Sequence, residues 1–382
     1  MSKKCDLHYS EMVRKSYQRL PGQGLWTWIT AKELPDRETM WHSTGLECLL
    51  WSCLWFFGGI AGAIAILQSD INSIWLLLPT LFTVGGARYI VATIIHHAVH
   101  HTVFDTPLAN KVVAEVFSTI TLVQPYESYR RFHVFEHHGK DFSTGEDQDL
   151  AAIYKLGLCP GLSVPELKLI LLAQCINPIF HLNFFFGRIK SNIVGVPLYR
   201  LAMTVAWLSI LTCTAYWLGL KDFLVAILLP CTVLYQICSL LHLVTEHAWV
   251  IRAEDETVKQ SHHQNSLGRF CGEAVPHHHS KVVSSIMWTV WGFKHLAWHI
   301  PCRILFVQGS LAVHDWHHRH GGKRDWPNAI QHREEEVQKE KSQGVYTYTD
   351  IWGFSNCVEY ALTRISESSL TIDTTNLSYR LN

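Results

Sequence analysis

The chain has 382 residues, with 32 Lys and Arg balanced by 32 Asp and Glu, and it contains 24 histidines. Only 17% of the residues are charged and 48% are hydrophobic. Zero net charge argues against a nucleic-acid binder, the apolar content excludes a disordered chain, and 11 scattered cysteines without a Cys-x-x-Cys pair argue against a disulfide-rich secreted domain. The excess of histidine makes a metal site in a membrane protein the hypothesis to test.

Four apolar runs predict two helical hairpins that cross a membrane. Residues 1–48 are mostly polar, lack a signal peptide and predict a cytosolic N-terminal segment. Each run is long enough, at about 1.5 Å per residue, to cross a hydrocarbon core of about 30 Å. The first hairpin pairs Leu49–Gln68 with Ile74–Ile95, and the second pairs Leu198–Leu220 with Phe223–Val244.

Two further apolar stretches are interrupted by polar residues and proline. Leu167–Phe186 contains Asn177-Pro178, and Val282–Phe306 contains Lys294 and Pro301. We expect amphipathic helices at the membrane interface, with a fifth or sixth span as the alternative. The fold class is therefore an all-α integral membrane protein, with a membrane domain over 49–330 and a polar cytosolic tail over 331–382.

The distribution of positive charge predicts the orientation. With four spans, every Lys and Arg except Lys221 and Arg88 lies on one side of the membrane. The positive-inside rule places that side, with both termini, in the cytosol. The membrane is then a bacterial inner membrane or the endoplasmic reticulum.

The histidines cluster at the cytosolic ends of the predicted spans and in the following loops. His96 and His100 are four residues apart and share one face of a helix, and His314, His317 and His318 share another. His138 follows His133 by five residues, so it needs a distorted backbone or binds a second metal. The clusters are His96, His97, His100 and His101; His133, His137 and His138; His242 and His247; and His314, His317, His318 and His320.

So many histidines exceed the ligands of a single zinc ion, which indicates two metals. The sequence has no Glu-x-x-His motif of the carboxylate-bridged di-iron bundles. An all-imidazole centre remains, and iron suits O2 activation because zinc has no redox chemistry.

Three strings resemble the histidine boxes of membrane fatty acid desaturases, a superfamily that includes hydroxylases and ketolases. They are His96-His97-Ala98-Val99-His100-His101-Thr102-Val103-Phe104, Arg130-Arg131-Phe132-His133-Val134-Phe135-Glu136-His137-His138 and His314-Asp315-Trp316-His317-His318. The resemblance implies an O2-dependent di-iron enzyme that acts on a lipid. Phe104 matches the family's first box, which favours His96 and His100 over His97 and His101. An extra ligand is expected at the end of the fourth span. The implied ligands are His96, His100, His133, His137, His138, His247, His314, His317 and His318, with His242 as the alternative to His247.

The resemblance leaves the outcome of the reaction open. A desaturase is expected first, and a hydroxylase or ketolase on a lipid or isoprenoid chain second. A non-enzymatic membrane metal-binding protein and a zinc hydrolase are further alternatives. Electrons would come from a ferredoxin, a rubredoxin or a cytochrome b5-type donor, because the chain has no cofactor motif of its own.

Some residues near the boxes are interpreted as supporting or unrelated. Asp149 and Asp315 are expected to orient metal-bound imidazoles, whereas Asp147 is nearly as well explained as a solvated loop acid. His262 and His263 are expected at the surface. His295 and His299 lie among tryptophans and are expected to anchor the interface or contact substrate.

Overall fold

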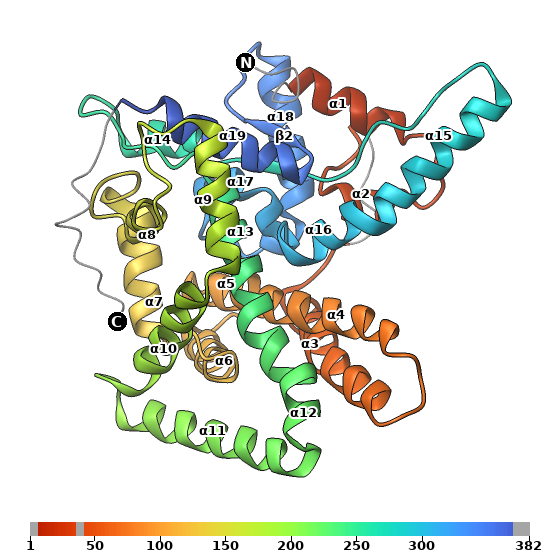
Figure 1. The fold of residues 1–382 in the computed structure, drawn as a ribbon. Coiled ribbons are helices and arrows are strands. Elements are labelled where there is room, and N and C mark those ends of the chain that lie inside the picture. Colours follow the sequence, from red (N-terminus) through yellow and green to blue (C-terminus); the bar gives the residue numbers. More distant parts are fainter. Residues whose placement is uncertain (1–6, 36–41, 370–382) are drawn as a thin grey trace.

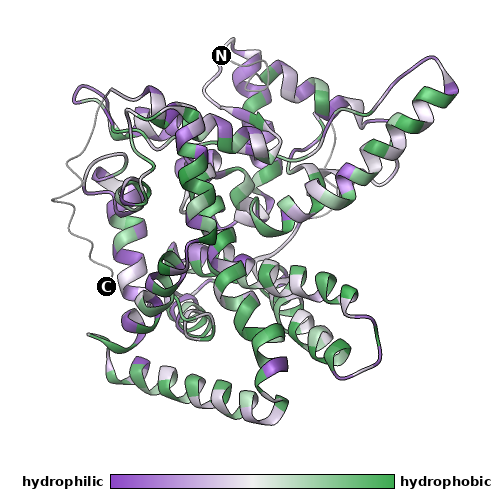
Figure 2. Ribbon diagram, viewed as in Figure 1, coloured by the Kyte–Doolittle hydropathy of each residue, from purple (hydrophilic) through white to green (hydrophobic). Residues whose placement is uncertain are grey.

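A computed structural model describes residues 7–35 and 42–369. The chain is mostly helical, as predicted (Figure 1). Apolar helices fill the lower half of the view, and polar residues gather in the upper half (Figure 2). The histidine clusters lie where these halves meet, on the elements that join the spans to the polar cap.

The first predicted hairpin is present and tightly packed. Helix α3 (Gly45–Leu67) begins with a capping box formed by Thr44 and Glu47, and α4 (Leu77–Tyr89) returns beside it. A Cβ at Gly86 would lie 2.3 Å from the backbone nitrogen of Phe56, so glycine permits this close approach. The returning helix also includes η2 (Ser73–Leu76), η3 (Ile90–Ile95) and α5 (His96–Val99).

The second predicted hairpin turns at Gly219, whose φ of 81° suits glycine. Together the hairpins supply four helices that are long and apolar enough to cross a membrane: Gly45–Leu67, Ser73–Val99, Leu198–Leu218 and Leu220–Glu246. The second hairpin consists of α11 (Leu198–Leu218), α12 (Leu220–Phe223), η5 (Leu224–Leu228), η6 (Pro230–Leu234) and α13 (Tyr235–Glu246).

The two interrupted apolar stretches are helical but differ in shape. Helices α9 (Val164–Ile176) and α10 (Pro178–Ile193) meet at a bend of 62°, and as a pair they too are apolar enough to cross a membrane. Helix α15 (Lys281–Lys294) stands away from the body and exposes large apolar side chains such as Ile286 and Phe293 (Figure 1). It continues into η7 (His295–His299) and α16 (Ile300–Leu305).

The polar cap is built from short helices and one pair of parallel strands. Strand β1 (Gly268–Phe270) pairs with β2 (Asp350–Trp352), with Arg269 opposite Ile351. The helices of the cap are α1 (Leu7–Ser16), α2 (Gln23–Thr30), α8 (Gln148–Lys155), α14 (Val258–Asn265), η8 (Gly309–Ala312), α17 (His314–His320), η9 (Trp326–Asn328), α18 (Ala329–Ser342) and α19 (Phe354–Glu367). Between the cap and the spans lie α6 (Pro107–Ile120), α7 (Tyr126–Arg130) and η4 (Arg131–Lys140).

Much of the predicted polar tail is folded into this cap. Helix α19 packs Leu362 and Ile365 against Leu150 and Leu240. The sequence predicts a solvated tail because the segment is rich in charged residues. Part of it is buried because several of these charges form ion pairs inside the protein. The buried pairs are Lys32–Glu334 and Lys32–Asp350, both 2.9 Å, Arg333–Asp315 at 2.5 Å and Arg333–Asp350 at 2.7 Å. Residues 370–382 of the expected tail lie outside the described residues.

Candidate metal centre

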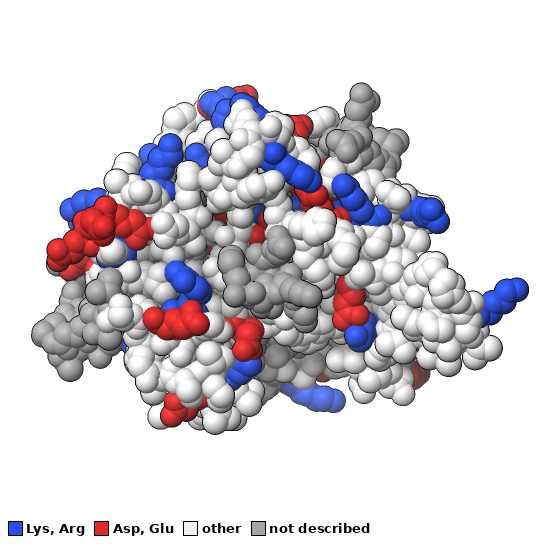
Figure 3. All heavy atoms as spheres, turned by 90° about the horizontal axis from the view of Figure 1, so that it is seen from above, with Lys and Arg blue, Asp and Glu red and all other residues white. Residues whose placement is uncertain are grey.

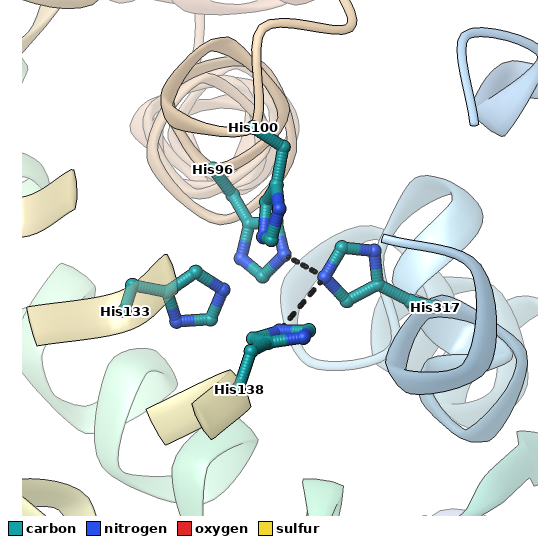
Figure 4. A group of neighbouring side chains, drawn as sticks. All are labelled: His96, His100, His133, His138 and His317. Atoms are coloured by element: carbon teal, nitrogen blue, oxygen red, sulfur yellow. Dashed lines mark hydrogen bonds between the residues drawn. The ribbon is translucent and has the colours of Figure 1, made fainter. Parts of the chain in front are cut away.

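Five histidines from three distant parts of the chain converge on one point (Figure 4). One ring nitrogen of each lies within 4.8 Å of the corresponding nitrogens of the others. Nε2 of His317 lies 2.7 Å from Nε2 of His96 and 3.2 Å from Nε2 of His138. We call these residues the five-histidine group: His96, His100, His133, His138 and His317.

Four further histidines form a second group beside the first. The Nε2 atoms of His247, His314 and His318 lie 3.0 to 3.1 Å from one another, and His137 completes the set. We call His137, His247, His314 and His318 the four-histidine group. The nine ligands implied by the resemblance therefore meet in two sets, and the second and third boxes each contribute to both.

The backbone of the second box explains this division. Residues Arg131–Lys140 form a π-helix, η4, in which each turn is wider than in an α-helix. Residues five apart then lie closer to one face than they do in an α-helix, and the rings of His133 and His138 converge, with centroids 4.7 Å apart. His137 is turned toward the four-histidine group. Of the two explanations offered for the spacing of His138, the distorted backbone is the one observed.

His247 and His242 have different surroundings at the end of the fourth span. His247 follows the last residue of α13 in an extended conformation, and this carries its ring into the four-histidine group. His242 lies in neither group. Its Nδ1 is 2.6 Å from the carbonyl oxygen of Phe306, and its Nε2 is 3.1 Å from Glu246. The position of His247 in the site thus depends on the helix ending one residue before it.

The other box histidines have structural partners. His97 stacks on Trp326 with ring centroids 4.0 Å apart. His101 contacts the hydroxyl of Tyr126, and His320 pairs with Glu336 at 2.8 Å. His97, His101 and His320 lie outside both histidine groups.

Burial keeps most of the clustered imidazoles neutral. It lowers the pKa of His100 to about 3 and lowers the pKa of His133 and of His318 well below the usual range. Neutral imidazole is the form that binds a metal. The buried Nε2 atoms of His100 and His133 have no hydrogen-bond partner, which is the state expected of metal ligands without their ion. Both groups therefore fit a metal ion by donor type, burial and spacing.

Carboxylates touch the four-histidine group. Nδ1 of His137 lies 3.2 Å from both carboxylate oxygens of Asp147. Burial alone would lower the pKa of His137, but the charge and hydrogen bond of Asp147, together with the charges of Asp149 and Glu246, outweigh burial and raise that pKa to about 9. The backbone nitrogen of Asp149 donates to Asp147, and burial raises the pKa of Asp149 to about 7. A carboxylate on the outer nitrogen fixes the tautomer so that Nε2 faces the metal.

Asp315 has a different partner from the one expected. Its carboxylate accepts hydrogen bonds from Arg333 at 2.5 to 3.0 Å, rather than bonding to an imidazole. It therefore holds α17 against α18. The sequence favoured Asp315 over Asp147 because Asp315 lies inside a box, but the Asp315 carboxylate bonds to Arg333 and not to either histidine group.

Two residues at the site lack a motif in the sequence. The hydroxyl of Tyr129 lies 3.4 Å from Nδ1 of His96, and its position four residues before His133 was an available signal. His262, expected at the surface, is instead buried, with its ring centroid 4.6 Å from that of His318. No sequence motif indicates the burial of His262, which results from the packing of α14 over the site. His295 and His299 are also buried, 4.8 Å apart by ring centroids, and lie outside both groups.

Comparison with known families agrees with this arrangement. The family model described as "Fatty acid desaturase" matches residues 73–279, more than half of the chain. The matched segment includes the first two boxes and His247, and it ends before the third box at His314–His318. The comparison with curated proteins finds no match.

Proposed function

Since this chain belongs to the fatty acid desaturase family, we propose that it is an O2-dependent di-iron desaturase that introduces a double bond into a fatty acyl or other lipid chain. The observation that carries the proposal is the division of nine clustered histidines into groups of five and four. A single zinc site would leave most of these side chains unexplained. Iron supports the required redox chemistry with imidazole ligands.

The reaction needs a strong oxidant because an unactivated C–H bond has no accessible pKa. Iron bound in the two groups would supply that oxidising power with O2. The protein holds and orients the imidazoles, and Asp147 fixes the tautomer of His137. Burial of the ligands, with His137, His247 and His314 each 1% exposed, limits the contact of these three imidazoles with bulk water.

The surroundings of the site support a lipid substrate and an external electron donor. Two of the four apolar helices, Ser73–Val99 and Leu220–Glu246, end at the histidine groups, so an aliphatic chain would reach the site from the membrane. We place the histidine groups on the cytosolic side by the positive-inside rule. A ferredoxin, a rubredoxin or a cytochrome b5-type protein would deliver electrons there.

Lipid profiling tests the proposal. Cells that express the protein should gain an unsaturated lipid that is absent from cells expressing His317→Ala. The matched control is His279→Ala, an exposed histidine outside both groups. Products labelled from 18O2 would instead identify a hydroxylase. No change in any lipid with the wild-type protein and its electron donor would contradict the proposal.

A further inference from the structure

His262 on α14 is a buried histidine that the proposed mechanism does not use. This residue is only 7% exposed to solvent. Neither ring nitrogen has a hydrogen-bond partner that meets the usual distance and angle limits, although the backbone of His138 lies close enough to influence the pKa of the ring. A buried polar atom without a partner costs about 1–3 kcal/mol, and it calls for an explanation such as an ion.

The neighbours of His262 place it beside the four-histidine group but outside it. Its ring stacks on Phe142 at 4.1 Å and lies 4.6 Å from the His318 ring and 6.1 Å from the His138 ring, between centroids. Its nitrogens belong to neither set of converging ligand atoms. The imidazole is therefore adjacent to a metal ligand without being one of the converging ligands.

A pocket of about 560 Å³ opens on the same two histidines. His318 is the one member of the four-histidine group that lines it. The other three members are each 1% exposed, so an ion that enters from this pocket meets the group first at His318. The lining residues are Val258, Lys259, His262, His263, His318, Arg319, His320 and Glu336.

We propose that this pocket, between α14, α17 and α18, is the route by which a divalent metal ion reaches the four-histidine group, with His262 binding the ion transiently beside His318. The proposal rests on the proposed metal centre. Glu336, which pairs with His320 at 2.8 Å, offers carboxylate oxygens along the same route. Such a series of donors lets an ion exchange its water ligands for imidazoles stepwise, without crossing an apolar barrier.

Two cations line the pocket and differ in how they are held. Arg319 donates to Thr347 and lies over the Tyr348 ring, 3.6 Å from its centroid. Lys259 is exposed and has no such restraint. Charged side chains of both signs are scattered over this polar side of the molecule (Figure 3). The charge of Lys259 opposes the approach of a cation, and reversing it should speed metal uptake.

Timed iron uptake tests the route without measuring enzyme activity. The full-length protein without metal is mixed anaerobically with Fe²⁺, and iron per chain is measured over time. In His262→Phe, which keeps a ring against Phe142, one of the two irons should bind about tenfold more slowly, with the final ratio unchanged. The matched control is His279→Phe, outside the pocket.

Charge reversal supplies a second variant that does not depend on a buried change. Lys259→Glu should take up one iron severalfold faster than the wild type at low ionic strength. Lys281→Glu, an exposed lysine on α15, should not. Unchanged rates in both His262→Phe and Lys259→Glu overturn the route. A final ratio of one iron in His262→Phe also overturns it, because His262 would then be a permanent ligand. A wild-type protein that binds no iron would overturn the proposed function itself.

Discussion

The five-histidine and four-histidine groups share the helix α17 but differ in their surroundings. The five-histidine group is completed by α5 and η4 and is lined by imidazoles and Tyr129. The four-histidine group has Asp147 on His137, Glu246 3.8 Å from His314, and the pocket at His318. One site thus has more nitrogen donors, and the other has nearby carboxylates and access to solvent. The two metals should therefore respond differently to substitution.

Removing one ligand from each group should have the largest effect. His317→Ala leaves four imidazoles in its group, whereas His318→Ala leaves three in the other. Both variants should lose detectable turnover, but His318→Ala should retain about one iron per chain and His317→Ala more than that, because an ion held by four nitrogens still has a complete set. Iron analysis of the purified proteins measures this. Equal iron in both variants would remove the distinction between the groups.

Breaking the ion pair behind the third box should affect both groups together. Arg333→Met leaves Asp315 and Asp350 buried without their shared cation. Losing one partner of a buried pair costs about 3–5 kcal/mol, so the midpoint of thermal unfolding should fall clearly. Both irons should be weakened because α17 supplies both groups. The control is Arg324→Met, whose pair with Asp105 is exposed. Loss of one iron alone would show that α17 does not move as a unit.

The carboxylate on His137 offers a smaller and selective change. Asp147→Asn keeps the size of the side chain but removes the charge that orients the His137 ring. The affinity of the four-histidine group for iron should fall about 10–100-fold, while the five-histidine group is unchanged. Competition with a chelator measures both affinities. Glu146→Gln, at an exposed neighbour, is the control. Equal weakening of both sites would place Asp147 in a general structural role.

The smallest expected effect is a change in the pH dependence of stability when Glu336, in the pocket, is replaced. Burial opposes the ionisation of Glu336, but its hydrogen bonds with His320 and Tyr348 outweigh burial and lower its pKa from 4.5 to about 2. The stabilisation by this carboxylate is present above about pH 4.5 and is lost as the pH falls toward about 2. Glu336→Gln should therefore lose less stability than the wild type between pH 5 and about 3. Parallel unfolding curves would show that Glu336 contributes little.

The sequence predicted the spans and the nine clustered histidines, because hydropathy and box spacing are local signals. It did not predict the division into two groups, since this depends on the π-helix at Arg131–Lys140 and on α13 ending before His247. Asp147 and His262 acquire their positions only from tertiary packing. The same is true of the folded tail, where Arg333 and Asp350 are buried by pairing with charges far away in the sequence.

The central claim is that the chain holds two irons in unlike sets of imidazoles, and Mössbauer spectroscopy of the protein reconstituted with 57Fe tests it most directly. The account predicts two irons per chain and two ferrous quadrupole doublets of equal area, one for each histidine group. His317→Ala should alter one doublet and His318→Ala the other. A single iron per chain, or one doublet that both substitutions change alike, would contradict two distinct sites.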